Sequence, residues 1–189
     1  ELDWNHPLMR NRYPPESENS FKQMLMESDK FLDQLEQLPQ TFNHGDTYPT
    51  NFMSQKDENG NDQTIALDWA LMGSQPIGDD LSQFVFGVME KLSNIDRNEI
   101  LEKLLKEYQR GLQESGLKIN PLLVRFGFCT TAAIRVGLFQ VYLINESIKT
   151  INELPEEKIE YELKPDCYEV MMAKEANKLI QIIHPNFIS

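Results

Sequence analysis

The chain has 189 residues, 40% of them hydrophobic and 25% charged, and its formal net charge is −12. This length and balance permit a globular core without disulfides, and they exclude collagen-like, low-complexity and intrinsically disordered classes. A chain this acidic is poorly suited to binding nucleic acid or an anionic membrane, because both repel it. The charge fits a cationic ligand, although solubility alone is the simpler explanation.

The two cysteines, Cys129 and Cys167, are too few for a disulfide framework and lack the spacing of a zinc site. A cytoplasmic, reducing location is therefore expected, and no signal peptide opens the chain. The apolar stretch 122–144 is long enough to span a bilayer. Because Arg125, Arg135 and Gln140 interrupt it, a buried helix is the better interpretation, and no membrane partner is predicted.

The first third of the chain predicts a helix, a loop and a hairpin. Residues 1–19 show no clean period and carry prolines, which favour loops or short turns. A helical pattern begins at Ser20, a suitable N-cap, and ends at Pro39. Residues 41–52 are rich in turn formers and are expected to form a structured loop. Two short strands, 52–55 and 64–67, are expected to pair around the turn Asn59-Gly60.

The rest of the chain predicts helices. Apolar residues at helical spacing cover 81–92, and the capping residues Asp96 and Asn120 predict helices that begin directly after them. A last helix is expected after Pro165. The predicted fold is mainly α with a small β-hairpin, in the α+β class. We interpret residues 1–189 as one helical lobe, with a catalytic loop and metal-site hairpin at 41–70 and a helical substrate-binding part at 79–189.

The most informative segment reads HGDTYPTN from His44 to Asn51, and it is followed by the predicted hairpin and Asp68. Asp68 follows Asn51 by 17 positions, an interval that two short strands and a long turn would use to bring the two residues together. The carboxylates of Asp46 and Asp68 would then converge with the Asn51 amide oxygen. Such hard oxygen ligands suit Mg²⁺. Each residue alone is more often a turn residue or a helix cap, so the combination carries the prediction.

This arrangement resembles the C-terminal lobe of the aminoglycoside phosphotransferase and choline kinase family, which has a protein-kinase-like fold. HGDTYPTN fits the catalytic loop of that family, IALDW fits its metal-binding strand end, and QPIGDDLS fits the segment that follows. The resemblance implies that Asp46 is the catalytic carboxylate that orients the substrate hydroxyl, and that Asn51 and Asp68 bind magnesium. It also implies that His44 and Asp80 support the loop. It does not identify substrate-binding residues.

The function that the resemblance implies is a small-molecule kinase. Such an enzyme moves the γ-phosphoryl group of ATP, or of GTP, to a substrate hydroxyl with the help of Mg²⁺. The acidic chain gives a weak preference for a cationic acceptor, with acids supplied by the helix around 166–175. Family members also carry an N-terminal nucleotide lobe, for which the residues before His44 leave no room. The chain is therefore interpreted as the C-terminal lobe of a longer kinase, inactive without its nucleotide lobe.

Two other functions remain open at this point. A non-catalytic binding module derived from the same lobe would keep the motif and serve a partner protein. A metal-dependent hydrolase would use Asp46, Asp68 and a histidine, and it would bind its metal tightly without any nucleotide.

Overall fold

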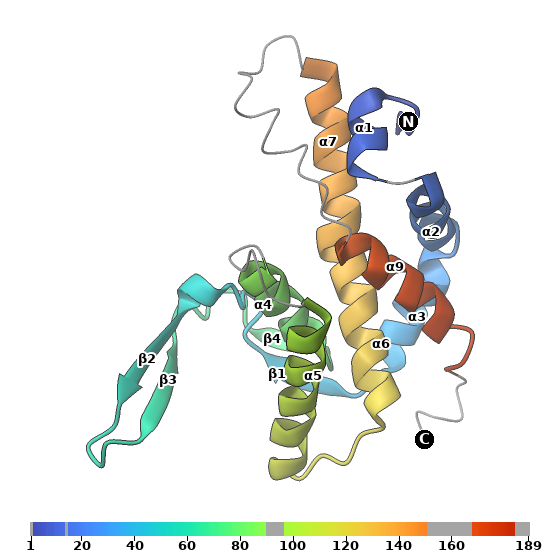
Figure 1. Ribbon diagram of the computed structural model, residues 1–189. Helices are drawn as coiled ribbons and strands as arrows, with labels where there is room; N and C mark the ends of the chain where they lie inside the picture. Colours follow the sequence, from blue (N-terminus) through green and yellow to red (C-terminus); the bar gives the residue numbers. More distant parts are fainter. Residues whose placement is uncertain (1, 14, 90–96, 151–167, 184–189) are drawn as a thin grey trace. The chain divides into compact units, whose positions relative to one another are not determined.

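The computed structural model describes residues 2–13, 15–89, 97–150 and 168–183 (Figure 1). The helices are α1 (Pro7–Arg12), α2 (Pro15–Met26), α3 (Ser28–Gln37), α4 (Asp79–Met89), α5 (Arg97–Glu114), α6 (Pro121–Thr131), α7 (Phe139–Thr150) and α9 (Tyr168–Leu179). A short 3-10 helix covers Pro49–Asn51, and a π-helical segment, Ala132–Leu138, joins α6 to α7. The strands are β1 (Gln40–Asn43), β2 (Phe52–Lys56), β3 (Asp62–Ala66) and β4 (Gly73–Pro76).

These elements form two compact units, and each is described by itself. Unit 1 comprises Glu1–Gln34 and Cys129–His184, and unit 2 comprises Leu35–Phe128 and Pro185–Ser189. Within the described residues, unit 1 is helical, whereas unit 2 holds all four strands and the segment that the sequence singled out. The mixture of helices with a small antiparallel β content agrees with the predicted α+β class.

Unit 1 packs its helices around aromatic side chains. Trp4, Tyr13 and Phe21 are buried, and their ring centroids lie between 5.8 and 6.3 Å apart. Gly137, in the π-helical segment, lies against Phe21 so closely that a Cβ atom there would be 2.8 Å from the ring. Helix α9 contacts both α2 and the π-helical segment. A small residue at position 137 therefore permits the close packing of this core.

A buried ion pair joins the two ends of the unit 1 sequence. Arg12 Nη2 lies 3.1 Å from Glu169 Oε1, and Glu169 is only 1% exposed. The Tyr13 hydroxyl donates to the same carboxylate oxygen at 3.4 Å. Burial, followed by the proximity of Glu169, raises the pKa of Tyr13. Glu169 lies within the stretch expected to supply acids for a cation, but the structure uses its charge to pair with Arg12.

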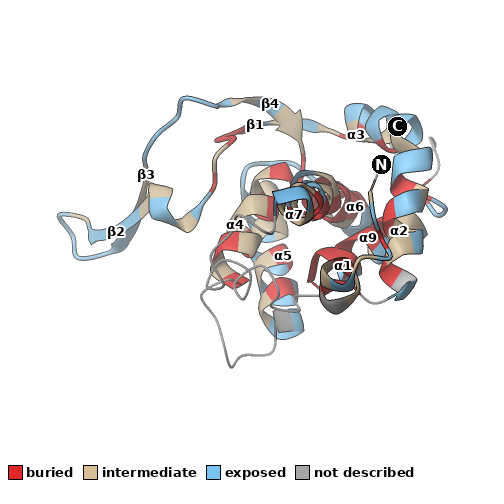
Figure 2. Cartoon of the chain, turned by 90° about the horizontal axis from the view of Figure 1, so that it is seen from above, coloured by how far each residue is buried: buried red, intermediate tan, exposed pale blue. Residues whose placement is uncertain are grey.

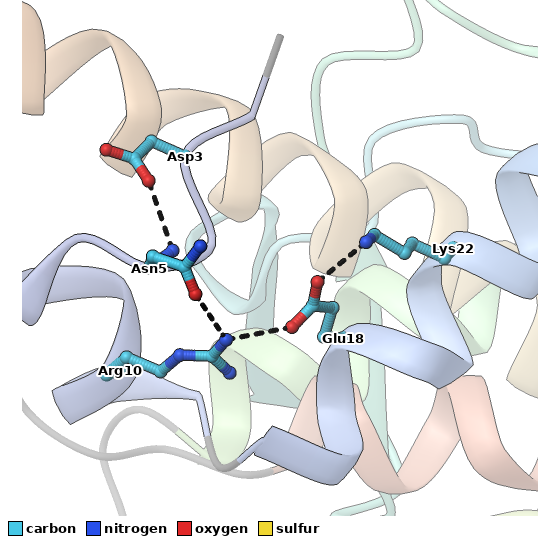
Figure 3. A network of polar contacts seen from close by, with 5 residues as sticks. All are labelled: Asp3, Asn5, Arg10, Glu18 and Lys22. Atoms are coloured by element: carbon cyan, nitrogen blue, oxygen red, sulfur yellow. Dashed lines mark hydrogen bonds and ion pairs between the residues drawn. The ribbon is translucent and has the colours of Figure 1, made fainter.

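A second polar network covers the surface of the same helices (Figure 3). Arg10 Nη2 donates to Asn5 Oδ1 and to Glu18 Oε2, each at 3.0 Å. Lys22 Nζ lies 2.7 Å from Glu18 Oε1. The pKa of Glu18 is lowered by its hydrogen bond with Lys22 and, to a smaller extent, by its hydrogen bond with Arg10. Ion pairs that water still reaches contribute little to stability, so unit 1 depends mainly on its buried core.

Unit 2 contains two separate antiparallel sheets. In the first, β2 pairs with β3, with Phe52 opposite Ala66 and Lys56 opposite Asp62, which confirms the predicted hairpin. Most residues of this hairpin are exposed (Figure 2). In the second sheet, β1 pairs with β4, with Gln40 opposite Pro76. The sequence predicted loops for both of these strands, because they are short, polar and without an apolar alternation.

The helix boundaries agree with the caps in most places. Helices α5 and α6 begin where Asp96 and Asn120 predict. The predicted start of the first long helix at Ser20 is wrong, because α2 starts at Pro15. The predicted single helix is also divided, since Glu27 separates α2 from α3. Proline is favourable in a first helical turn, so Pro15 opens a helix here instead of preventing one.

One helical stretch among the described residues, Pro121–Thr150, is long and apolar enough to cross a membrane. Of the most apolar 18-residue stretch of this helix, 67% is buried inside the protein, which agrees with a core helix. In unit 2 its backbone packs tightly on the turn before α4. A Cβ atom on Gly127 would lie 2.0 Å from the Ile77 carbonyl oxygen, and one on Gly78 would lie 2.6 Å from Phe128 N.

Candidate functional site

The segment His44–Thr47, here named the site loop, is held by the first turn of α4. Asp80 accepts hydrogen bonds from His44 N at 2.9 Å and from Gly45 N at 3.1 Å, one with each carboxylate oxygen. The Thr47 hydroxyl donates to the Asp80 carbonyl oxygen. Buried backbone donors outside regular structure need such partners. Asp80 therefore fixes the course of the site loop.

His44 uses both ring nitrogens inside the protein. Its Nε2 lies 2.7 Å from the Leu67 carbonyl oxygen, and its Nδ1 accepts a hydrogen bond from Asp46 N at 3.3 Å. The side chain is buried, and its ring centroid lies 4.5 Å from that of Trp69. Because Nδ1 is an acceptor, the ring proton is on Nε2, and Nε2–H donates a hydrogen bond to the Leu67 carbonyl oxygen. In this geometry His44 joins the site loop to the end of β3 and has no nitrogen left for a metal ion.

Gly45 is required by its surroundings. Its φ is +80°, and a Cβ atom there would lie 2.1 Å from the Leu71 carbonyl oxygen. A side chain would thus meet both an unfavourable backbone conformation and a backbone atom that cannot easily move. The segment after β3 consequently lies directly against the site loop.

The structure brings Asp46 and Asn51 together. Asn51 Nδ2 donates to the Asp46 carbonyl oxygen and to Asp46 Oδ2, each at 3.0 Å. This orientation leaves Asn51 Oδ1 available as an oxygen ligand. The Asn51 carbonyl oxygen in turn accepts from Leu67 N at 2.8 Å, so that Asp68 follows directly after a residue bonded to Asn51. The predicted return of the chain over 17 positions is therefore present in the backbone.

Asp68 has an unusual backbone conformation. Its φ is +56°, and among the described residues it is the one non-glycine residue with a positive φ. Trp69 Nε1 donates to the Ala66 carbonyl oxygen at 3.0 Å and closes a tight turn around Asp68, whose side chain is exposed. Strained backbone of this kind is concentrated at functional sites, where the surrounding structure maintains it.

The donor set suits a magnesium ion whose coordination is completed by other molecules. Two carboxylates and an amide oxygen are hard ligands, and Mg²⁺ is usually held by few protein groups together with phosphate oxygens and water. No group of three or more His, Cys, Asp or Glu side chains that could hold a metal occurs in the part of the chain that the structure describes. The residue types Asp46, Asn51 and Asp68 are thus compatible with a magnesium ion that phosphate oxygens and water also coordinate.

A cavity of about 530 Å³ lies beside the site loop. It is lined by Thr47, Pro49, Phe52, Met53, Ser54, Thr64, Asp80, Leu81, Phe84 and Tyr108. The lining is mainly apolar, and the Tyr108 hydroxyl accepts a hydrogen bond from Gly78 N at 3.0 Å. Burial raises the pKa of Tyr108. Sequence reasoning missed Tyr108, because its apolar spacing in α5 indicated only a core position.

Several large apolar side chains near Asp68 are exposed. Phe42 and Trp69 are 69% and 44% exposed, and their rings stack with centroids 6.2 Å apart. Leu71 and Met72, in the segment after Trp69, are 62% and 56% exposed. Exposed apolar residues that gather in one place are typical of interaction surfaces.

The comparisons with known proteins place the chain in a family. The model of the ecdysteroid kinase-like family matches residues 7–120, and the chain belongs to this family. It is a phosphotransferase family with a protein-kinase-like fold, which agrees at this level with the kinase that the sequence predicts. The matched residues include the site loop, the hairpin and the cavity. Neither a curated protein nor a solved structure gives a match.

Proposed function

We propose that the protein is a small-molecule kinase that transfers the γ-phosphoryl group of ATP, or of GTP, to a substrate hydroxyl. The observation that carries this proposal is the double hydrogen bond from Asn51 to Asp46. The Asn51 carbonyl oxygen also accepts a hydrogen bond from Leu67 N, the residue before Asp68. Membership of a phosphotransferase family supports it. Its more specific form, a likeness to aminoglycoside phosphotransferases and choline kinases, rests on the motif alone.

Each site residue has a defined part in this proposal. Asp46 accepts or orients the proton of the attacking hydroxyl, and Asn51 fixes the direction of its carboxylate. Asn51 Oδ1 and the Asp68 carboxylate would hold Mg²⁺. When bound, the ion neutralises charge on the transferred phosphoryl group. His44 and Asp80 keep the loop in place through the contacts described above.

We further propose that the chain supplies the C-terminal lobe of the kinase and that a nucleotide lobe of the same protein covers the apolar surface around Asp68. Phe42, Trp69, Leu71 and Met72 make this surface costly to leave in water. The lobe described here would then be inactive alone. We also propose a cytoplasmic location, where ATP is plentiful.

The cavity favours an uncharged, largely apolar alcohol as the acceptor over a cation. Its ionisable lining groups are Asp80, which already accepts two backbone hydrogen bonds, and Tyr108. The name of the family also points to a steroid alcohol. The net charge of −12 is a property of the whole chain and carries less weight than the lining of this cavity.

A metal-dependent hydrolase is less well supported, because the nearest histidine, His44, has both ring nitrogens engaged. No observation in the described residues favours a non-catalytic module.

Binding of Mg·ATP to the protein with its nucleotide lobe tests the proposal. Asp68→Asn should weaken the Mg²⁺ dependence of ATP binding by about tenfold or more, whereas Asp33→Asn on the exposed side of α3 should leave it unchanged. The chain alone should transfer phosphate to steroid or amino alcohols negligibly. Turnover by the chain alone at about 1–100 per second would contradict the assignment as one lobe.

A further inference from the structure

The four consecutive backbone N–H groups of the site loop are all held by side chains. Asp80 accepts from His44 N and Gly45 N, and His44 Nδ1 accepts from Asp46 N. The fourth donor, Thr47 N, is bonded to Gln83 Oε1 at 3.1 Å. Thr47 is buried, so its N–H could not turn to water if Gln83 were absent.

Gln83 lies on the face of α4 that carries the whole loop. Asp80, Gln83, Phe84 and Gly87 share one side of the helix, since residues three and four apart are neighbours. The Phe84 ring packs edge-on against Phe52, with centroids 5.8 Å apart. A Cβ atom on Gly87 would lie 2.5 Å from the Pro49 ring. This face of α4 therefore contacts the chain from His44 to Phe52, and Gln83 lies at its centre.

We propose that Gln83 is a positioning residue for Asp46, a role that rests on the function proposed above. Asp46 also has partners of its own. Its N–H donates to His44 Nδ1, and its carbonyl oxygen and Oδ2 accept from Asn51 Nδ2. The peptide group between Asp46 and Thr47 is bound at both ends. Its carbonyl oxygen accepts from Asn51 Nδ2, and its N–H, that of Thr47, donates to Gln83 Oε1.

The physical consequence is a fixed direction for the Asp46 carboxylate. If the peptide group that follows Asp46 rotates, the Asp46 carbonyl oxygen moves with it, and the double hydrogen bond from Asn51 can no longer be made at both oxygens. Small errors in the placement of a reacting group reduce rates strongly, because positioning is a large part of catalysis. Loss of the Gln83 contact should therefore slow transfer and leave the binding of Mg·ATP intact.

The first test measures the loop directly in the chain itself. Gln83→Met removes the acceptor and keeps the length of the side chain, and Gln83→Glu keeps an acceptor oxygen. Hydrogen exchange followed by NMR should be at least about tenfold faster for Thr47 N–H and the Asn51 side-chain amide in Gln83→Met. It should be near wild type in Gln83→Glu and in the matched control Gln109→Met, a half-buried position on α5. Unchanged exchange in a folded Gln83→Met protein would overturn the proposal.

The second test uses the protein with its nucleotide lobe and water as the acceptor of phosphate from Mg·ATP. Gln83→Met should lower kcat by about tenfold with KM for Mg·ATP unchanged, and Gln83→Glu should restore kcat. A Gln83→Met enzyme with wild-type kcat would also overturn the proposal. If the wild-type protein neither binds nor hydrolyses Mg·ATP, the kinase function itself is wrong, and the hydrogen exchange of the site loop still decides the role of Gln83 in holding Asp46.

Discussion

The acidic side chains discussed for units 1 and 2 differ in their burial and in their partners. In unit 1, Glu169 is 1% exposed and is neutralised by Arg12 across the interior. In unit 2, Asp46 and Asp80 are half-buried and Asp68 is exposed. The first arrangement holds two distant parts of the sequence together. In the second, Asp80 lines a cavity and Asp46 accepts a hydrogen bond from the Asn51 side-chain amide.

The presence of an acidic side chain therefore does not by itself locate a site in this chain. Asp80 accepts hydrogen bonds from two backbone N–H groups and supports the loop, whereas the proposed function assigns Asp46 and Asp68 to the substrate hydroxyl and the metal ion. The difference lies in which partner each carboxylate meets. Substitutions that remove charge but keep shape should therefore separate structural acids from functional ones.

The largest effect on stability should come from the buried pair of unit 1. Glu169→Gln removes the negative charge that lies beside the buried Arg12 guanidinium, and it should lower the free energy of unfolding by about 3–5 kcal/mol. The same change of acid to amide at Asp46 should alter it by less than about 1 kcal/mol, since that side chain is half-exposed. Urea unfolding followed by circular dichroism measures both. Equal losses in the two variants would remove the distinction between the units.

A second comparison concerns two glycines of unit 2 that share a left-handed backbone. Gly45 has φ +80° and meets the Leu71 carbonyl oxygen, whereas Gly60 has φ +83° at the hairpin turn with no neighbour within 4 Å. Gly60→Ala should cost about 1–2 kcal/mol through backbone conformation alone. Gly45→Ala should cost about 2–5 kcal/mol, because a steric clash is added.

The measurement is again the free energy of unfolding, with hydrogen exchange at His44 N to show whether the site loop has moved. A loss for Gly45→Ala no larger than that for Gly60→Ala would mean that the segment after β3 does not lie against the loop.

The sequence predicted the parts of this fold that local signals specify. The hairpin was predictable because Asn59-Gly60 is a strong turn and the strands beside it are continuous. The strands β1 and β4 were not, because their pairing partners are distant in sequence and their residues are polar. The return of Asp68 to Asn51 was predicted from spacing.

The contacts that support the site were only partly predictable. Asp80 belongs to a motif, so its place could be read from the sequence. Gln83 and Tyr108 belong to no motif, and helical periodicity does not reveal which loop a half-buried polar side chain meets. Their roles depend on tertiary packing that brings α4 and α5 to the site loop and to the turn before α4.

The smallest predicted effect concerns two tyrosines at alkaline pH, Tyr13, which is buried in unit 1, and Tyr108, which is half-buried in unit 2. Burial raises the pKa of Tyr13 in unit 1 and of Tyr108 in unit 2. Above the ordinary tyrosine pKa of about 10, the unfolded chain loses a proton that the folded chain still holds, so stability falls as pH rises. Each tyrosine should contribute a slope of at most about 1.4 kcal/mol per pH unit.

Tyr13→Phe and Tyr108→Phe should each reduce that slope between about pH 10 and pH 11 relative to wild type. Unfolding in urea at several pH values measures it. A slope that neither substitution changes would show that neither phenol is kept protonated by burial.

In the proposed function, Asp46 acts in the transfer step and Asp68 binds the metal together with its nucleotide. The most direct measurement compares Asp46→Asn with wild type in the protein with its nucleotide lobe, by isothermal titration with Mg·ATP and by turnover at saturating nucleotide. We expect a dissociation constant within about threefold of wild type and turnover reduced by about 10² or more, the scale of a lost general base. Loss of nucleotide binding with turnover at saturation preserved would contradict the account.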